Sequence, residues 1–117
     1  MVVALKPNLH ASGITVLQEA AIRGVAIVCT DTGGLRAYFS DKEIYYIPGS
    51  NSFELRNAIR KLAGDNELRW ALAARAQERM KSGILSSRSY ARRHAELSRE
   101  LLARETLSLA AAQARAK

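Results

Sequence analysis

The sequence predicts an α/β fold with a parallel sheet, because short apolar runs alternate with helical segments in its first half. The runs at residues 2–5 and 25–29 are apolar throughout, which is typical of strands buried on both faces. A third strand is expected at residues 43–47, ended by Pro48 and Gly49. Since helices separate the strands, right-handed crossovers are expected, and the prediction is a sheet of about three strands followed by three or more helices.

The helical segments of the first half are predicted from caps and stops. Ser12 is expected to cap a helix whose apolar stripe includes Ile14 and Leu17, and Gly24 is expected to end it. Residues 35–39 are expected to form a short helical turn before the third strand.

The second half predicts helices only. Asn51 and Glu54 have the spacing of a capping box, and Asp65 is expected to cap a second helix that ends near residues 82–83. A last helix is expected to start around Ser87. Apolar residues repeat at helical spacing in the first of these helices, at Leu55, Ala58, Ile59 and Leu62. In the second helix the residues expected to face inward are Leu68, Ala71, Leu72 and Met80, and in the last helix one stripe is expected to hold Tyr90, His94, Leu97 and Leu101.

Composition is that of a soluble globular domain, with 117 residues of which 48% are apolar and 25% charged. The domain is expected to span residues 1–104, and the Ala-rich residues 105–117 are expected to form a frayed tail. Cys29 is the single cysteine and lies in an apolar run, so it is interpreted as a small buried residue in a reducing compartment. The start lacks the pattern of a signal peptide, and no apolar run reaches the roughly 20 residues of a membrane span. The predicted location is the cytoplasm.

The net charge of +7 is unevenly placed along the chain. Residues 1–55 carry four basic and five acidic side chains, whereas residues 56–117 carry fourteen basic and six acidic ones. The simplest interpretation is a solvated helix surface rich in Arg and Ala. Peripheral contact with an anionic membrane, at its inner face, is the alternative. Nucleic acid is disfavoured as a partner, because few aromatic residues lie among the arginines of this half, which holds only Trp70 and Tyr90.

The stretch from residue 9 to residue 39 carries the clearest functional pattern. A Ser-Gly turn leads into a helix that bears the lone carboxylate Glu19, and an apolar strand then ends in the glycine turn Gly33–Gly34. A glycine between strand and helix lets a ligand approach the backbone, whose free amides favour an anion. A carboxylate further along the helix can accept hydrogen bonds from sugar hydroxyls. The pattern therefore indicates a nucleotide-sugar site.

The same residues support a resemblance to a known family. The order of Ser12–Gly13, Glu19–Ala20, Gly24, the apolar strand to Thr30–Asp31, Gly33–Gly34–Leu35, Tyr46–Ile47–Pro48–Gly49 and Ala58–Ile59 resembles the C-terminal, donor-binding half of family 4 retaining glycosyltransferases of GT-B fold. The likeness covers about residues 4–102 and extends through Asn66–Glu67–Leu68–Arg69 and Ala74–Arg75. It implies a partial Rossmann-like domain that binds a nucleotide-diphospho-sugar as substrate, with no cofactor and no metal.

The resemblance also implies roles for single residues. The donor-binding residues that it implies are Glu19, Gly13, Ile14, Thr15, Val16, Ser12, His10, Gly33 and Gly34. Glu19 would hold the ribose hydroxyls, the amides of residues 13–16 the diphosphate, and the glycine turn the floor of the pocket. Where the family often has a further glutamate eight residues before the ribose glutamate, this chain has Ala11, and the adjacent His10 could bond the sugar instead. The family's glutamate after the glycine turn is replaced by Ala37.

The resemblance covers only part of a GT-B enzyme, which also needs an N-terminal acceptor domain and more strands. The chain is therefore expected to be a truncated or split product that is inactive alone and has no catalytic residue of its own. The apolar edge at residues 2–5 is expected to pair with a second copy or with a separate first half.

Two other functions stay open. One is a non-enzymatic nucleotide-sugar-binding or interaction module of the same fold. The other is a receiver-like regulator, which needs clustered acidic residues at strand ends for a metal. Only Asp31 fits that requirement, so this alternative is poor.

Overall fold

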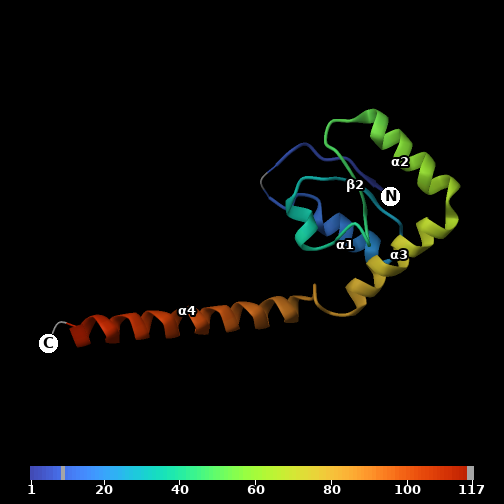
Figure 1. Ribbon diagram of the computed structural model, residues 1–117. Coiled ribbons are helices and arrows are strands. Elements are labelled where there is room, and N and C mark those ends of the chain that lie inside the picture. Colours follow the sequence, from blue (N-terminus) through green and yellow to red (C-terminus); the bar gives the residue numbers. More distant parts are fainter. Residues whose placement is uncertain (9, 116–117) are drawn as a thin grey trace. The chain divides into compact units, whose positions relative to one another are not determined.

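The computed structural model describes residues 1–8 and 10–115, and for residues 106–115 it describes the backbone alone (Figure 1). The described chain forms two compact units, Met1–Gly83 and Ile84–Lys117, which are treated separately below.

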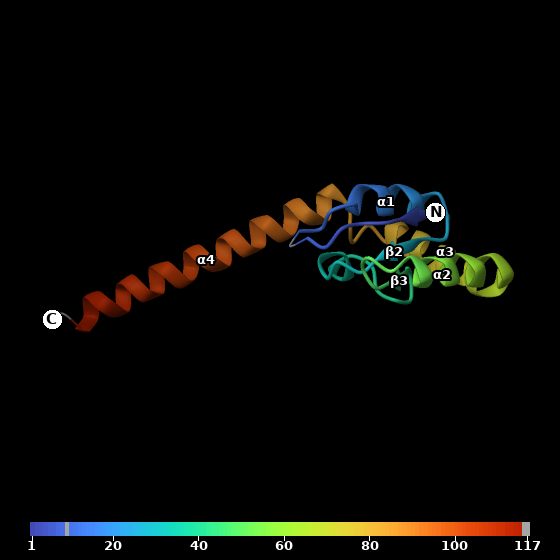
Figure 2. The ribbon, with the colours of Figure 1, turned by 90° about the horizontal axis from the view of Figure 1, so that it is seen from above.

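The first unit holds a three-stranded parallel sheet, which confirms the predicted α/β fold. The strands β1 (Val2–Val3), β2 (Val28–Thr30) and β3 (Tyr45–Ile47) lie in the order β1-β2-β3. Cys29 pairs with Val3 on one side and with Tyr46 on the other, so β2 is the central strand. Figure 2 shows the strands side by side from above.

All three strands are shorter than the sequence predicted, and β2 is also displaced. The ladder at β2 starts only at Val28, where Val2 first offers a partner, and it continues to Thr30. Residues 25–27 lie outside β2, and the Val25 amide donates instead to the Ala20 carbonyl at the end of the preceding helix, at 3.0 Å.

Four helical elements complete the first unit. They are α1 (Ile14–Ile22), the 3₁₀ turn η1 (Gly34–Ala37), α2 (Ser52–Gly64) and α3 (Asn66–Lys81). In Figure 1, α2 lies above the strands and α1 below them, so helices cover both faces of the sheet. The helix α3 packs against both α1 and α2. This is the layered arrangement that a parallel sheet requires to bury its apolar strands.

Successive side chains of each strand point to opposite faces of the sheet, so the core has a part on each face. The face under α2 is filled by the cluster Val28, Ile47, Ala58, Leu62 and Leu72, with Tyr45, Leu55 and Leu68 packed against it. The largest fully buried side chains of the unit are Phe39, Leu17, Ile27, Leu35, Ile44 and Cys29. Of the residues at helical spacing in α2, Ile59 lies at the rim and is 43% exposed, since each residue turns a helix by about 100° and the buried stripe follows Ala58 and Leu62.

Two of the three predicted caps are confirmed. The Asn51 side chain accepts from the Glu54 amide at 3.1 Å, and the Asp65 side chain accepts from the Leu68 amide at 2.8 Å. The predicted Ser12 cap is wrong, because α1 starts one residue later, with Gly13 as its N-cap and no side-chain cap bond.

The cap at Asp65 is expected to stabilise the fold measurably. Asp65→Ala should lower the free energy of unfolding by about 1 kcal/mol, because the Leu68 amide loses its acceptor. Asp65→Asn is the matched control, since asparagine caps about as well as aspartate. Urea denaturation of the three proteins measures the difference, and equal losses in both variants would show that the cap bond is not the cause.

The second unit contains α4 (Ser87–Arg115), which starts where the sequence predicts. The four residues of its predicted stripe are all exposed: Tyr90 at 67%, Leu97 at 43% and Leu101 at 56%, together with His94. The rings of Tyr90 and His94 lie 4.3 Å apart between centroids. The frayed tail predicted at residues 105–117 and the domain boundary at residue 104 stay predictions, because the side chains of residues 106–117 lie outside the described residues.

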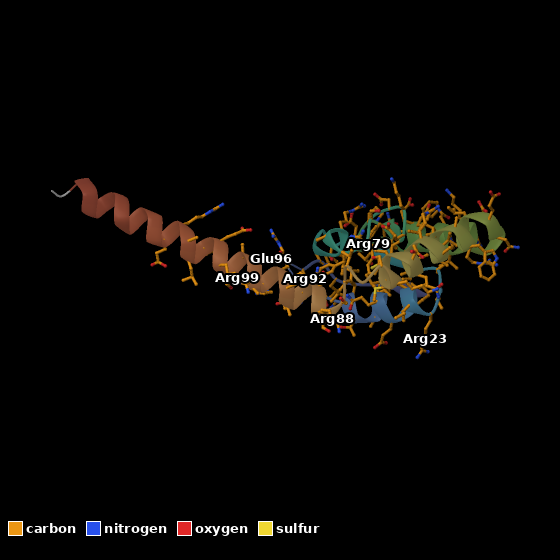
Figure 3. The ribbon with its side chains drawn as sticks, turned by 90° about the horizontal axis from the view of Figure 1, so that it is seen from below. Arg23, Arg79, Arg88, Arg92, Glu96 and Arg99 are labelled. Carbon is orange, nitrogen blue, oxygen red and sulfur yellow. The ribbon has the colours of Figure 1, made fainter. Side chains whose placement is uncertain are left out.

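Arginines line α4, and Figure 3 shows Arg88, Arg92 and Arg99 projecting from it. Arg93 and Glu96 form an ion pair at 3.7 Å. Among the described residues, no helix is both long enough and apolar enough to cross a membrane. Contact of this basic region with an anionic membrane, the alternative to a solvated helix surface, stays a prediction.

Candidate functional site

The loops that follow the three strands meet at one edge of the sheet. Because the strands are parallel, their carboxyl ends point the same way, and ligands of open α/β sheets bind outside this edge. The segments concerned are residues 4–13 after β1, residues 31–34 after β2 and residues 48–51 after β3. Every residue that the sequence predicts for donor binding, except those along α1, lies in the first two segments.

Gly13 shapes the start of α1. Its backbone is left-handed, with φ of 85°, a conformation that other residues adopt only at a cost. A Cβ at this position would lie 3.3 Å from Leu5 Cδ1 and 3.5 Å from Val3 Cγ1. Gly13 therefore lets the helix begin directly against the strand that precedes it. The predicted role of this glycine, close approach of a ligand to the backbone, stays a prediction.

The first turn of α1 presents backbone amides. Ile14 donates to the Ala11 carbonyl in a long bond of 3.3 Å. Within the part of the chain that the structure describes, the amides of Gly13, Thr15 and Val16 donate to no protein acceptor. Such orphan donors, together with the positive end of the helix dipole, form an environment that favours an anion.

The glycine turn after β2 lies against the loop before α1. A Cβ on Gly34 would sit 3.4 Å from the Ala11 nitrogen and 3.4 Å from the His10 carbonyl carbon. The missing side chain is what permits this approach. The structure thus brings together two predicted segments, residues 10–13 and Gly33–Gly34, that are twenty residues apart in sequence.

The two polar side chains predicted to hold the sugar are both accessible. Glu19 is exposed on α1, and His10 is exposed in the loop before it. The backbone amide of His10 donates to the Asn8 side chain at 3.2 Å, which shapes that loop. Ser12 is half-buried, and its amide donates to the His10 carbonyl at 2.9 Å.

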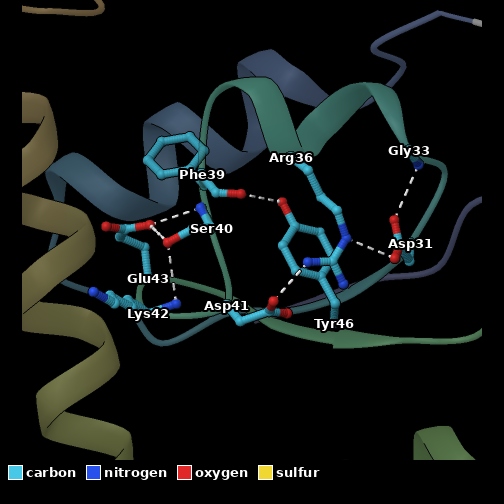
Figure 4. Close-up of polar contacts among 9 residues, drawn as sticks. All are labelled: Asp31, Gly33, Arg36, Phe39, Ser40, Asp41, Lys42, Glu43 and Tyr46. Carbon is cyan, nitrogen blue, oxygen red and sulfur yellow. Dashed lines mark hydrogen bonds and ion pairs between the residues drawn. The ribbon is translucent and has the colours of Figure 1, made fainter.

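A polar cluster on β3 and η1 was missed from the sequence. Arg36 donates to Asp31 Oδ2 and to Asp41 Oδ2, each at 2.7 Å, and we call these three residues the Arg36 bridge (Figure 4). The guanidinium lies 4.6 Å from the centroid of the Tyr46 ring. Asp31 Oδ1 also accepts from the Gly33 amide at 3.0 Å. A cavity of about 340 Å³ adjoins the cluster and is lined by Asp31, Arg36, Tyr46, Ile47 and Pro48.

These contacts also shift the pKa values of Asp31 and Tyr46. The hydrogen bond from Arg36 lowers the pKa of Asp31, and burial raises the pKa of the Tyr46 phenol. Because the folded carboxyl has the lower pKa, its pairing stabilises the fold above the unfolded pKa of about 4 and is lost as pH falls further. At neutral pH the Asp31 carboxylate is therefore charged and paired with Arg36.

A second cavity, of about 370 Å³, opens on the α2 side of the same edge. It is lined by Ala4, Leu5, Lys6, Thr30, Ile47, Pro48, Ser50, Asn51, Ser52 and Leu55. Thr30 is buried in its wall and accepts from the Leu5 amide at 3.1 Å. In the described part of the chain, no three His, Cys, Asp or Glu side chains gather closely enough to hold a metal ion.

Comparison with known protein families decides the family. Residues 15–99 match the profile of a family described as glycosyl transferase-like. The chain belongs to this glycosyl transferase-like family. A search of curated proteins found no match.

The family match covers part of the candidate site. It begins at Thr15 and so includes Thr15, Val16, Glu19 and the glycine turn, together with the whole sheet except β1. The loop with His10, Ser12, Gly13 and Ile14 precedes the matched residues. The match therefore covers the carboxyl edge of the sheet only from α1 onward.

Proposed function

We propose that this glycosyl transferase-like domain binds the nucleotide part of a nucleotide-diphospho-sugar donor at the carboxyl edge of its sheet. The observation that carries the proposal is the contact of Gly34 with His10 and Ala11, which brings the glycine turn beside the open amides of α1. The amides of residues 13–16 would bind the diphosphate, and Glu19 would accept hydrogen bonds from the ribose hydroxyls. Both would act in a retaining sugar transfer.

Direct titration tests this proposal. ADP, GDP and UDP are titrated into the full chain by calorimetry, followed by the monophosphate and the nucleoside of whichever base binds tightest. If the amides of α1 form the anion site, affinity should fall from diphosphate to monophosphate to nucleoside. Equal affinities across this series would contradict a phosphate role for the turn.

Glu19→Ala is expected to weaken binding of that nucleoside diphosphate at least about tenfold. A hydrogen bond to a charged group is worth about 1.5–3 kcal/mol, and two ribose hydroxyls would lose their acceptor. The fold should be unaffected, because Glu19 is exposed. Glu78→Ala, which removes another exposed carboxylate from a helix, is the matched control and should bind as the unchanged chain does. Wild-type affinity in the Glu19 variant would remove Glu19 from the site.

Transfer of the sugar is proposed to need a partner that holds the acceptor. Catalysis by positioning requires donor and acceptor side by side, which can be worth about 7–11 kcal/mol. The edge strand β1 offers backbone groups on its outer side for pairing with a second copy or a separate acceptor domain.

A non-enzymatic module of the same fold is the second candidate. Ala11 and Ala37 stand where the resemblance leads one to expect carboxylates, and this favours binding without turnover. Turnover of a labelled sugar nucleotide, in the presence of a partner domain, separates the two candidates.

A further inference from the structure

We infer that Arg36 is a positioning residue for the glycine turn, through a chain of contacts that fixes Gly33 and Gly34 before any ligand arrives. This inference rests on the proposed function and extends it to a residue that would not touch the donor. It starts from the geometry of the Arg36 bridge (Figure 4).

The first step concerns Asp31, which links the glycine turn to Arg36. Asp31 follows β2 directly, and its backbone amide donates to the Ile47 carbonyl of β3 at 2.8 Å, so its position is set by the sheet. Its carboxylate uses both oxygens, one for the Gly33 amide and the other for Arg36 Nε. The same carboxylate therefore connects the turn with the arginine.

The second step concerns what holds the arginine. Arg36 Nη1 donates to Asp41, which follows η1 in the chain, at 2.7 Å, and the guanidinium lies over the Tyr46 ring. Tyr46 is held in turn, since its hydroxyl donates to the Phe39 carbonyl at 2.9 Å, and Phe39 is fully buried. Two acceptors and one ring surface leave the guanidinium little freedom to rotate.

The third step asks what this arrangement contributes. The Arg36 side chain is 40% exposed, and ion pairs at such exposure add little to global stability. Gly33, by contrast, has φ of 83°, and no atom lies within 4 Å of where its Cβ would be, apart from those of Gly33 itself and its two chain neighbours. Glycine has more conformational freedom to lose than any other residue. The Arg36 bridge therefore acts on the shape of the turn, and a turn already ordered binds its ligand more tightly.

The test compares Arg36→Gln with Arg56→Gln in the full chain. Arg56 is a matched control, because its guanidinium also lies over an aromatic ring, that of Phe53 at 5.2 Å, but on α2. Two quantities are measured: hydrogen exchange of the Gly33 and Gly34 amides by NMR without ligand, and affinity for the tightest of ADP, GDP and UDP. Arg36→Gln should speed exchange at Gly33, whose amide donates to Asp31, and weaken binding about five- to tenfold, with an unchanged urea midpoint. Arg56→Gln should change neither exchange nor affinity.

Further variants separate positioning from a general structural effect. Arg36→Lys keeps the charge and should recover part of the affinity. Asp31→Asn should weaken binding as Arg36→Gln does, and the double variant should lose no more than either one, since both break the same chain of contacts. Glu19→Ala combined with Arg36→Gln should instead show multiplied losses, because Glu19 acts independently of the turn.

Each other outcome has one meaning. Unchanged exchange at Gly33 in Arg36→Gln overturns the positioning role, whatever the affinities are. Faster exchange with unchanged affinity overturns it as well, and shows that the turn does not bind the nucleotide. If the unchanged chain binds none of the three diphosphates, the proposed function fails and this inference fails with it. Binding that is lost in Glu19→Ala and kept in Arg36→Gln overturns this inference alone.

Discussion

Phe39→Ala is expected to lower the free energy of unfolding by about 3–5 kcal/mol, the range typical of a large aromatic side chain removed from a core. Phe39 is fully buried and is the largest of the fully buried side chains. Its backbone also matters, since its amide donates to Leu35 at 3.1 Å and its carbonyl accepts from Tyr46 at 2.9 Å. Truncation leaves a cavity at the point where η1 joins the sheet.

The chain supplies a matched control for this substitution. Phe53, the other phenylalanine, is 57% exposed at the start of α2, so Phe53→Ala should change stability by no more than about 0.5 kcal/mol. Urea denaturation followed by circular dichroism measures both. Similar losses in the two variants would contradict the assignment of Phe39 to the core. A Phe39→Leu variant keeps most of the volume and is expected to lie between the two.

Gly13→Val is expected to reduce nucleoside diphosphate affinity by more than about tenfold and to destabilise the fold. The left-handed backbone costs a residue with a side chain about 1–2 kcal/mol, and a β-branched one fits it worst. The added Cβ also meets Leu5 and Val3, so the start of α1 must move away from the strand. Since the amides of residues 13–16 are proposed to bind the diphosphate, displacing them should lower the affinity for nucleoside diphosphate directly.

Gly83→Val separates the strain from the site. Gly83 has a similar φ of 76° but nothing within 4 Å of its Cβ position, and it lies at the end of α3. This variant should lose stability and keep wild-type affinity for the diphosphate. Scanning calorimetry measures the stability, and titration calorimetry measures the affinity at a temperature where each protein is folded. An equal loss of affinity in the two variants would show that destabilisation, rather than the position of the turn, controls binding.

The fold was predictable from local signals, whereas the predicted element ends depend on neighbours that those signals do not specify. Apolar runs alternating with capped helices suffice to predict a parallel sheet, and the caps at Asn51 and Asp65 need only short-range spacing. Strand ends were wrong because a strand lasts only as long as its neighbour provides partners, and β1 provides two residues. Ser12 was expected as a cap from its residue type, but the left-handed Gly13 beside it decides where α1 begins.

The candidate site was predictable where glycine carries the signal and hidden where tertiary contacts do. Gly13, Gly33 and Gly34 stand out in the sequence because glycine between a strand and a helix allows backbone conformations and close approaches that other residues do not. Arg36 offers no such sign, since it is one of many arginines and each of its partners lies five residues away, a spacing that no helix or strand brings together. Its role depends on η1 folding back over β3, which only the assembled sheet determines.

The buried thiol of Cys29 is a chemical probe for opening of the central strand. The thiol is fully buried in the central strand, and burial together with the nearby Asp31 charge raises its pKa to about 11. A thiol reagent attacks the thiolate, so near neutral pH it can reach this sulfur only while β2 is open to solvent. The rate of labelling at this one atom therefore counts the opening events of the central strand, and ligands that close the carboxyl edge should slow it.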